Sequence, residues 1–215
     1  PALLVSLRET ERHYQEEKIL KSSTTKNPIN MADEKKPAPD INQSANTDSR
    51  EMIPVKNAGM VLLNNYILML LDRLGLTQDD KFKNEECQEQ AVHYLQYLVT
   101  GLEHTEEFLL PLNKLLCGIP LETPITDGFT IKDDEKKLIE GLLEAAINYW
   151  AAIGKSSIEG LRGNFLVRDG LLSETEDRWE LKVEKRPYDI LIAQSPFSFS
   201  IIKYAWMNKP LHVTW

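Results

Sequence analysis

The stretch Trp179-Glu-Leu-Lys-Val-Glu184 alternates apolar and polar residues with a period of two. That period is typical of a β-strand with one buried and one solvated face. A second short apolar run, Gly170-Leu-Leu-Ser173, precedes it, and Thr175-Glu-Asp177 between the two runs has the composition of a turn. The pattern predicts a β-hairpin with Trp179, Leu181 and Val183 on its apolar face.

The residues before the hairpin follow the helical period instead. Segment 58–75 is apolar nearly all round and stops at Gly75, and residues 88–100 place their apolar side chains on one helical face. A shorter helix is expected over 106–116, where Pro111 either kinks the helix or marks its first turn. A polar loop over 77–86 and an extended connector over 118–125 separate these helices.

The clearest helix is expected over 131–153, with Thr130 as its N-cap and Gly154 at its C-terminal end. Ser156 and Glu159 then have capping-box spacing, which predicts a helix that runs to Leu166. The expected buried stripe of the long helix consists of Leu138, Ile139, Leu142, Leu143, Ala146, Ile147, Trp150 and Ile153.

After the hairpin, strands are expected over 199–206 and 211–215. The whole pattern predicts an α+β fold, with a helical N-terminal part of about five helices and a small antiparallel β unit at the C-terminus. Residues 1–21 are expected to form a short charged helix. Residues 22–51, rich in Ser, Thr, Asn, Asp, Lys and Pro, are expected to form a flexible linker, and residues 52–215 a globular domain.

The last twenty residues carry an unusual number of large rings for a chain end. Such rings stabilise a protein when buried and are a liability when exposed. The terminus is therefore expected to dock, either on its own domain through Tyr149 and Trp150 or on a partner, and Trp215 is expected in its own core. The candidate partner-interface residues are Phe197, Phe199, Tyr204, Trp206, Met207 and Trp215.

Composition limits the possible functions. Hydrophobic residues make up 42% of the chain and charged residues 27%, which is ordinary for a soluble protein. A net charge of -8 argues against binding to a nucleic-acid backbone and against electrostatic binding to a membrane. Two cysteines are too few for a disulfide framework and favour a reducing compartment during folding. The most hydrophobic segment, 58–71, is shorter than a membrane span.

Residues that could carry chemistry do not form a recognisable motif. The four histidines lack ligand spacing to Cys87 or Cys117, and His93 is expected at the edge of the core. Glu140 and Glu144 lie one helical turn apart, which is typical of a solvated face. Residues 160–165 lack the spacing of a phosphate loop. No enzyme activity, metal or cofactor is therefore predicted.

Six strings in order resemble the C-terminal domain of the tape measure proteins of extracellular contractile injection systems, which are phage-tail-like particles. The resemblance runs from about Ile53 to Trp215. The strings are Val55-Lys-Asn-Ala-Gly-Met-Val-Leu-Leu63, Ala91-Val-His-Tyr-Leu-Gln-Tyr-Leu-Val-Thr-Gly101, Leu112-Asn-Lys-Leu-Leu-Cys-Gly-Ile-Pro-Leu121, Ser157-Ile-Glu-Gly-Leu-Arg-Gly-Asn-Phe-Leu166, Val183-Glu-Lys-Arg-Pro-Tyr-Asp-Ile-Leu191 and Trp206-Met-Asn-Lys-Pro-Leu-His-Val-Thr-Trp215.

The resemblance implies a structural assembly protein that fixes the length of the inner tube and sheath. As one continuous helix, all 215 residues would span roughly 320 Å, which is short for such tubes. The chain is therefore expected to be an anchor at one end of a longer ruler. The expected anchoring site is a terminal structure of the particle, with the baseplate hub and spike favoured over the cap.

The resemblance also implies partners and a location. The inner tube, the hub and spike or the cap are the expected partners. The three- or six-fold symmetry of terminal structures implies a homo-oligomer, a trimer or a hexamer. Assembly is expected in the bacterial cytoplasm, followed by residence in the released particle. Three other functions stay open: a cap or baseplate adaptor that does not measure length, a delivered effector enzyme, and a soluble adaptor unrelated to such particles.

Overall fold

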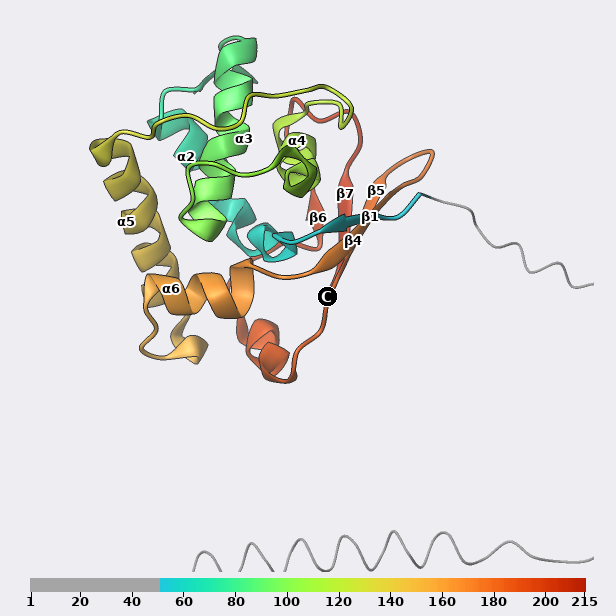
Figure 1. Ribbon diagram of the computed structural model, residues 1–215. Coiled ribbons are helices and arrows are strands. Elements are labelled where there is room, and N and C mark those ends of the chain that lie inside the picture. The colour runs from blue at the N-terminus through green and yellow to red at the C-terminus, as the bar shows by residue number, and fades with distance from the viewer. Residues whose placement is uncertain (1–50) are drawn as a thin grey trace, which may run out of the picture. The chain divides into compact units, whose positions relative to one another are not determined.

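The computed structural model of the chain describes residues 51–215 (Figure 1). The predicted helix over 1–21 and all but the last residue of the predicted linker over 22–51 lie outside the described residues. Helices dominate the first two thirds of the described part. They are α2 (Asn64–Arg73), α3 (Glu85–Thr100), α4 (Pro111–Cys117), α5 (Asp133–Tyr149) and α6 (Ile158–Leu161).

Shorter helical turns connect these helices to each other and to the strands. The 3-10 turns are η1 (Ala58–Leu63), η2 (Glu107–Leu109), η3 (Ala151–Ile153) and η5 (Pro187–Gln194), and η4 (Arg162–Leu166) is a single π-helical turn. The predicted helix over 58–75 is therefore η1 followed by α2. Gly59 lets η1 pack directly against η4, since a Cβ at Gly59 would lie 1.7 Å from the carbonyl oxygen of Phe165.

Five strands form one sheet in the order β1-β4-β5-β7-β6. The described α-helices lie to one side of this sheet, with α4 nearest to it (Figure 1). The predicted α+β class is confirmed. The strands are β1 (Ile53–Val55), β4 (Gly170–Glu174), β5 (Trp179–Val183), β6 (Ile201–Ile202) and β7 (Leu211–Thr214).

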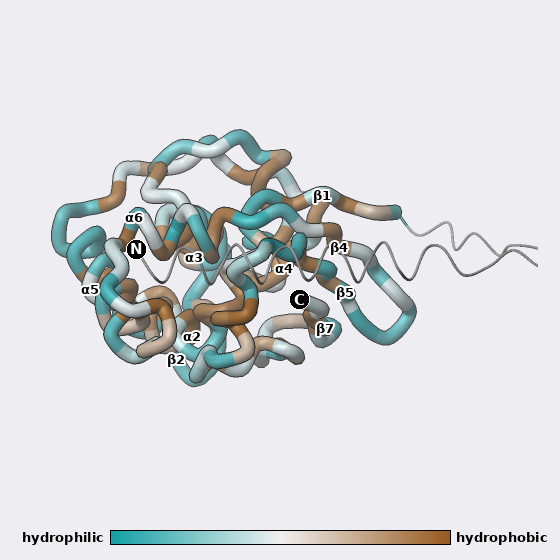
Figure 2. Tube along the Cα trace, turned by 90° about the horizontal axis from the view of Figure 1, so that it is seen from below, coloured by the Kyte–Doolittle hydropathy of each residue, from teal (hydrophilic) through white to brown (hydrophobic). Residues whose placement is uncertain are grey.

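The predicted hairpin is β4–β5, in which Leu172 lies opposite Leu181. Its turn is hydrophilic and projects from the rest of the described chain (Figure 2). Two features of the sheet differ from the expectation of an antiparallel C-terminal unit: β1, from the start of the domain, pairs with β4, and β7 runs parallel to β5. A parallel pair needs a long crossover, which residues 184–210 provide.

Several boundaries shift for local reasons. Helix α5 begins at Asp133 rather than at Ile131, because the carboxylate of Glu135 accepts a hydrogen bond from the backbone N–H of Lys132, which takes the N-cap position expected for Thr130. Ser157, not Ser156, caps α6: its Oγ accepts from the N–H of Gly160 at 3.0 Å. Pro111 marks the first turn of α4, the second of the two expected alternatives.

Two further segments differ in their strands. The predicted loop over 77–86 contains a small hairpin, β2 (Thr77–Gln78) and β3 (Lys81–Phe82), whose turn residues Asp79 and Asp80 both have positive φ. Aspartate tolerates that conformation better than most residues. The predicted strand over 199–206 shrinks to β6, since the chain turns at Tyr204, whose carbonyl oxygen accepts from the N–H of Met207.

The helical core closes around Trp150, whose side chain is fully buried. Its ring packs against Phe165 at 4.7 Å and Phe197 at 5.8 Å between ring centroids. Tyr149, the other expected contact of the terminal aromatics, is 64% exposed. Docking of Phe197 on the long helix therefore uses Trp150 as its main contact.

A buried polar cluster ties the start of the domain to two helices. The side-chain amide of Asn57 donates to Gln96 of α3 and to Asn113 of α4. Asn113 in turn donates to the carbonyl oxygen of Val92 at 3.0 Å. All three side chains are buried, so each hydrogen bond satisfies a group that would otherwise be costly to bury.

Arg168 lies at the centre of the C-terminal part and its side chain is fully buried. Its guanidinium donates to both carboxylate oxygens of Asp189 at 2.9 and 3.0 Å and to the carbonyl oxygens of Asn164 and Glu184. The rings of Tyr188 and Trp215 lie over it at 5.6 and 5.1 Å. One side chain therefore joins η4, the residue after β5, η5 and the chain end.

The variant Asp189→Asn is expected to lower the free energy of unfolding by about 3 kcal/mol at pH 7, because it leaves the buried guanidinium without a counter-charge. Burial alone would raise the pKa of Asp189. Hydrogen bonds from the Arg186 N–H, Arg168 and Trp215 outweigh burial and lower the pKa. The stabilisation is therefore complete above about pH 4 and is lost as pH falls through the folded-state pKa.

Urea unfolding at pH 7 and pH 3 measures both effects. The unchanged protein should lose more stability between these two pH values than Asp189→Asn does. Asp169→Asn is the matched control, since Asp169 forms an exposed ion pair with Lys56 and should change stability by less than about 1 kcal/mol. Equal stability of Asp189→Asn and the unchanged protein at pH 7 would contradict the role given to this ion pair.

Candidate docking groove

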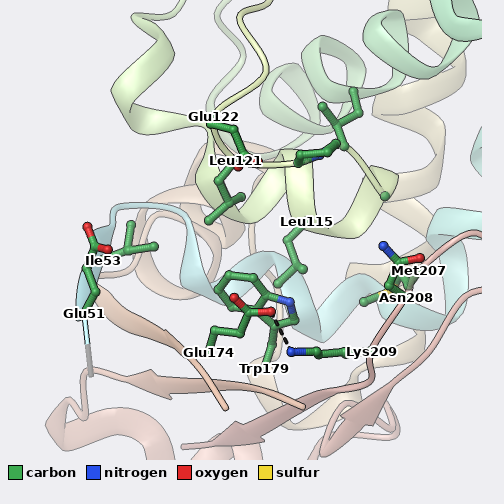
Figure 3. A pocket seen from close by; sticks show the side chains of 13 residues that line it. Glu51, Ile53, Leu115, Leu121, Glu122, Glu174, Trp179, Met207, Asn208 and Lys209 are labelled. Carbon is green, nitrogen blue, oxygen red and sulfur yellow. Dashed lines mark hydrogen bonds and ion pairs between the residues drawn. The ribbon is translucent and has the colours of Figure 1, made fainter. Parts of the chain in front are cut away.

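A hollow of about 820 Å³ lies between the helical part and the sheet (Figure 3). Four segments form its walls: the start of β1, the end of α4 with the turn that follows it, the β4–β5 hairpin, and the residues just before β7. We call it the docking groove. Its lining residues are Glu51, Ile53, Leu115, Gly118, Ile119, Pro120, Leu121, Glu122, Glu174, Trp179, Met207, Asn208 and Lys209.

Lys114 holds the turn that forms one wall of the groove. The Lys114 side chain is buried, and its Nζ donates to the carbonyl oxygens of Leu121 at 3.1 Å and Thr123 at 2.8 Å. Nζ also donates to the carboxylate of Glu107, and this hydrogen bond lowers the pKa of Glu107. A buried ammonium with three acceptors is satisfied, so the turn has a fixed position.

Gly118 joins that wall to the chain end. It ends α4 with φ of 73°, the left-handed conformation that favours glycine. A Cβ at this position would lie 2.7 Å from the carbonyl oxygen of Trp206. The indole N–H of Trp206 donates to the carbonyl oxygen of Leu116 at 2.8 Å. The residues before β7 are therefore fastened to the end of α4.

The hairpin and Lys209 form the facing wall. The Nζ of Lys209 donates to the carboxylate of Glu174 and to the carbonyl oxygen of Thr175, both at 2.8 Å. The backbone N–H of Trp179 donates to the carbonyl oxygen of Pro210 at 2.8 Å. In the close view Trp179 and Leu115 face the same hollow from opposite sides, with Leu121 beside them (Figure 3).

The groove combines an apolar floor with an acidic rim. Leu115, Leu121, Trp179 and Met207 supply apolar surface, and three carboxylates stand against the single ammonium of Lys209. Such a surface can hold an apolar side chain next to a cation. Across residues 51–215, His, Cys, Asp and Glu form no group of three or more that could hold a metal ion.

The structure buries three of the six predicted interface residues in the domain itself. They are Phe197, Tyr204 and Met207. Phe197 packs on Trp150, and the hydroxyl of Tyr204 donates to the side-chain oxygen of Asn64 at 2.8 Å. Met207 also lines the groove.

The other three candidates are half-buried. The rings of Phe199 and Trp215 pack edge to face at 5.6 Å, and Trp206 packs against Phe82 at 4.5 Å. The indole N–H of Trp215 donates to Asp189 at 3.0 Å. These contacts place Trp215 against its own core, and the three rings are each partly exposed.

Sequence reasoning missed Glu51, Leu121, Glu122, Glu174 and Lys209 as groove residues. They come from segments far apart in the chain, and no local pattern brings such segments together. One signal was present: Lys114 interrupts the apolar run 112–117, where a buried lysine must find acceptors. Its acceptors are the backbone of the groove wall.

The cysteines and His93 lie outside the groove. Cys117 is buried, which raises the pKa of its thiol, and both Cys87 and Cys117 are free. His93 is buried rather than at the core edge, and burial lowers its pKa despite nearby Glu89 and Asp127. Within 51–215, no helix is long and apolar enough to cross a membrane.

The variant Lys114→Met is expected to loosen the turn 118–123, because two carbonyl oxygens lose their donor, at a cost of about 1–3 kcal/mol. Hydrogen–deuterium exchange should show faster exchange in peptides that cover this turn. Lys137→Met, at an exposed position on α5, is the control. Unchanged exchange in Lys114→Met would show that the turn holds its position without this side chain.

The family to which the chain is similar is seen over nearly its whole length. A family model described as contractile injection system tape measure protein matches residues 5–215. The match reaches further towards the N-terminus than the resemblance in the six strings, which began at about Ile53. No curated protein and no solved structure matches the chain.

Proposed function

The chain belongs to the contractile injection system tape measure protein family, and on that premise we propose that residues 51–215 anchor the ruler at one end of the particle. We call these residues the head domain. The family is structural, and its members are components of contractile injection particles. The proposed anchoring site is a terminal structure, with the baseplate hub and spike favoured over the cap.

The shape of the head domain supports this proposal most directly. Its longest helix, α5, has 17 residues and therefore spans about 25 Å. The other elements fold back against α5 and the sheet instead of continuing as a rod. A ruler needs extended length, which this fold does not supply. A compact fold with a preformed groove is suited to holding one end of the ruler in place.

The proposal extends to partners and assembly. The head domain would contact subunits of the hub and spike, and the ruler would contact the inner tube. The symmetry of a terminal structure would bring several copies together, as a trimer or a hexamer. Assembly would take place in the bacterial cytoplasm before the particle is released. The net charge of -8 supports protein partners over nucleic acid.

Photo-crosslinking in assembled particles tests the anchoring site. Truncation before Ser195 is a poor test, because it removes β6 and β7 and so disturbs folding as well as docking. A photoreactive residue placed singly at Phe108, Tyr149, Ile190 or Ile201, all more than half exposed, leaves the core intact. Mass spectrometry should find crosslinks to hub or spike subunits.

Other crosslinking results would contradict the proposal in different ways. Crosslinks to cap subunits alone would move the anchor to the opposite end of the particle. Crosslinks to the inner tube at all four positions, with none to a terminal subunit, would remove the anchoring role. A photoreactive residue at Trp150, which is fully buried, should give crosslinks within the head domain only and serves as the control.

A further inference from the structure

The docking groove has a charge imbalance that its own residues do not resolve. Lys209 forms an ion pair with Glu174 at 2.8 Å, so its charge is already compensated. Glu51 and Glu122 are exposed, and no ion pair of either is found within the described residues. Glu122 stands beside Leu121, and Glu51 lies beside Ile53 at the β1 side of the groove (Figure 3). The rim therefore presents negative charge next to apolar surface.

We propose that the docking groove binds an extended segment of a terminal-structure subunit that carries a large apolar side chain beside lysine or arginine. This inference rests on the proposed function and names the contact through which anchoring occurs. The apolar side chain lies between Trp179 and Leu121, and the cation faces Glu51 and Glu122. The volume of about 820 Å³ is in the range of about 300–1,000 Å³ that accommodates compact ligands, which corresponds to a few residues.

Side-chain hydrogen bonds hold two walls of the groove in place. Lys114 fixes the turn that carries Leu121 and Glu122, and Lys209 fixes the hairpin that carries Glu174. A site that is already formed loses little freedom on binding, so more of the contact energy appears as affinity. Tryptophan in a partly enclosed position is also a frequent centre of binding energy.

The neighbouring sheet edge is less suited to a partner. Strand β1 stands at one end of the strand order, where a partner strand could add to the sheet. However, Pro54 lies in the middle of β1 and has no N–H to donate. Proline is one of the residues that protects an edge strand from further pairing. Side chains in the groove, rather than backbone pairing at β1, therefore provide the contact.

Charge also decides between possible occupants. A second copy of this chain carries a net charge of -8 and is repelled on average by an acidic rim. Residues 1–50 of the chain contain as many acidic as basic residues, so they have no net attraction to it. A basic segment of another subunit has both the charge and the apolar side chain that the groove accepts.

Peptide arrays provide the probe. Overlapping 15-residue peptides tile the hub, spike, inner-tube and cap subunits and also this chain itself, and the purified full chain is applied to them. Binding is expected at peptides of terminal subunits in which lysine or arginine adjoins a large apolar residue. In solution, the double variant Glu51→Lys/Glu122→Lys should lower the affinity of the chain for such a peptide by about tenfold or more.

The control variant is Asp72→Lys/Glu144→Lys, which makes the same charge change at exposed positions that do not line the groove. It should leave the affinity within about twofold. Trp179→Ala keeps every charge, and it should weaken peptide binding by a factor similar to that of Glu51→Lys/Glu122→Lys. Thermal unfolding of each variant checks that the fold is intact. Equal affinity of the rim and control variants would overturn the inference.

Two other outcomes would also overturn it. If no peptide binds, the groove is not a docking site for an extended segment. If the bound peptides come from residues 1–50 or from another surface of this chain, the occupant is the chain itself. In either case, crosslinks from Phe108 or Tyr149 to hub or spike subunits would leave the anchoring function standing, because these residues do not line the groove.

Discussion

The buried guanidinium of Arg168 is the interaction on which the C-terminal half depends. One of its terminal nitrogens donates to both carboxylate oxygens of Asp189, and the backbone carbonyl oxygen of Arg168 accepts from the N–H of Ala58 at the start of the domain. Since Trp215 stacks on Arg168 and donates to Asp189, the chain end is held at this centre. Strand β7, which leads to this chain end, runs parallel to β5. Removing either charge would leave the other buried without a counter-charge, which strongly destabilises a fold.

The docking groove follows from this placement. Once β7 lies beside β5, residues 207–209 face the hairpin, and Lys209 reaches Glu174. Trp206 and Gly118 bring the same residues against α4. A second buried cation, Lys114, then sets the turn on the opposite side. The buried ammonium of Lys114 and the half-buried ammonium of Lys209 thus hold the two facing walls of the hollow.

Much of the fold was predictable from local patterns, and the groove was not. The period of two in Trp179–Val183 and the long apolar stripe of α5 identified the hairpin, the main helix and the α+β class. The three-residue strand β1 and the two-residue strand β6 are too short for a pattern to show. The parallel pairing of β7 with β5 and the ion pair of Arg168 with Asp189, 21 residues away, join distant parts of the chain, which no local pattern shows. Of the six candidate interface residues in the terminal segment, Phe197, Tyr204 and Met207 are buried in the core of their own domain, a tertiary placement that the terminal sequence alone does not show.

The chain is a member of the tape measure protein family with a folded head domain over residues 51–215, and the proposed role of that domain is to hold one end of the ruler. The aromatic chain end packs within the head domain, and the acidic, apolar groove beside it is the proposed partner surface. The most direct measurement is a cryo-EM reconstruction of the intact particle with focused classification at both ends. The account predicts density for the head domain at the hub and spike, with a segment of a neighbouring subunit between Trp179 and Leu121. Density for the head domain at the cap, or along the tube with no terminal contact, would contradict it.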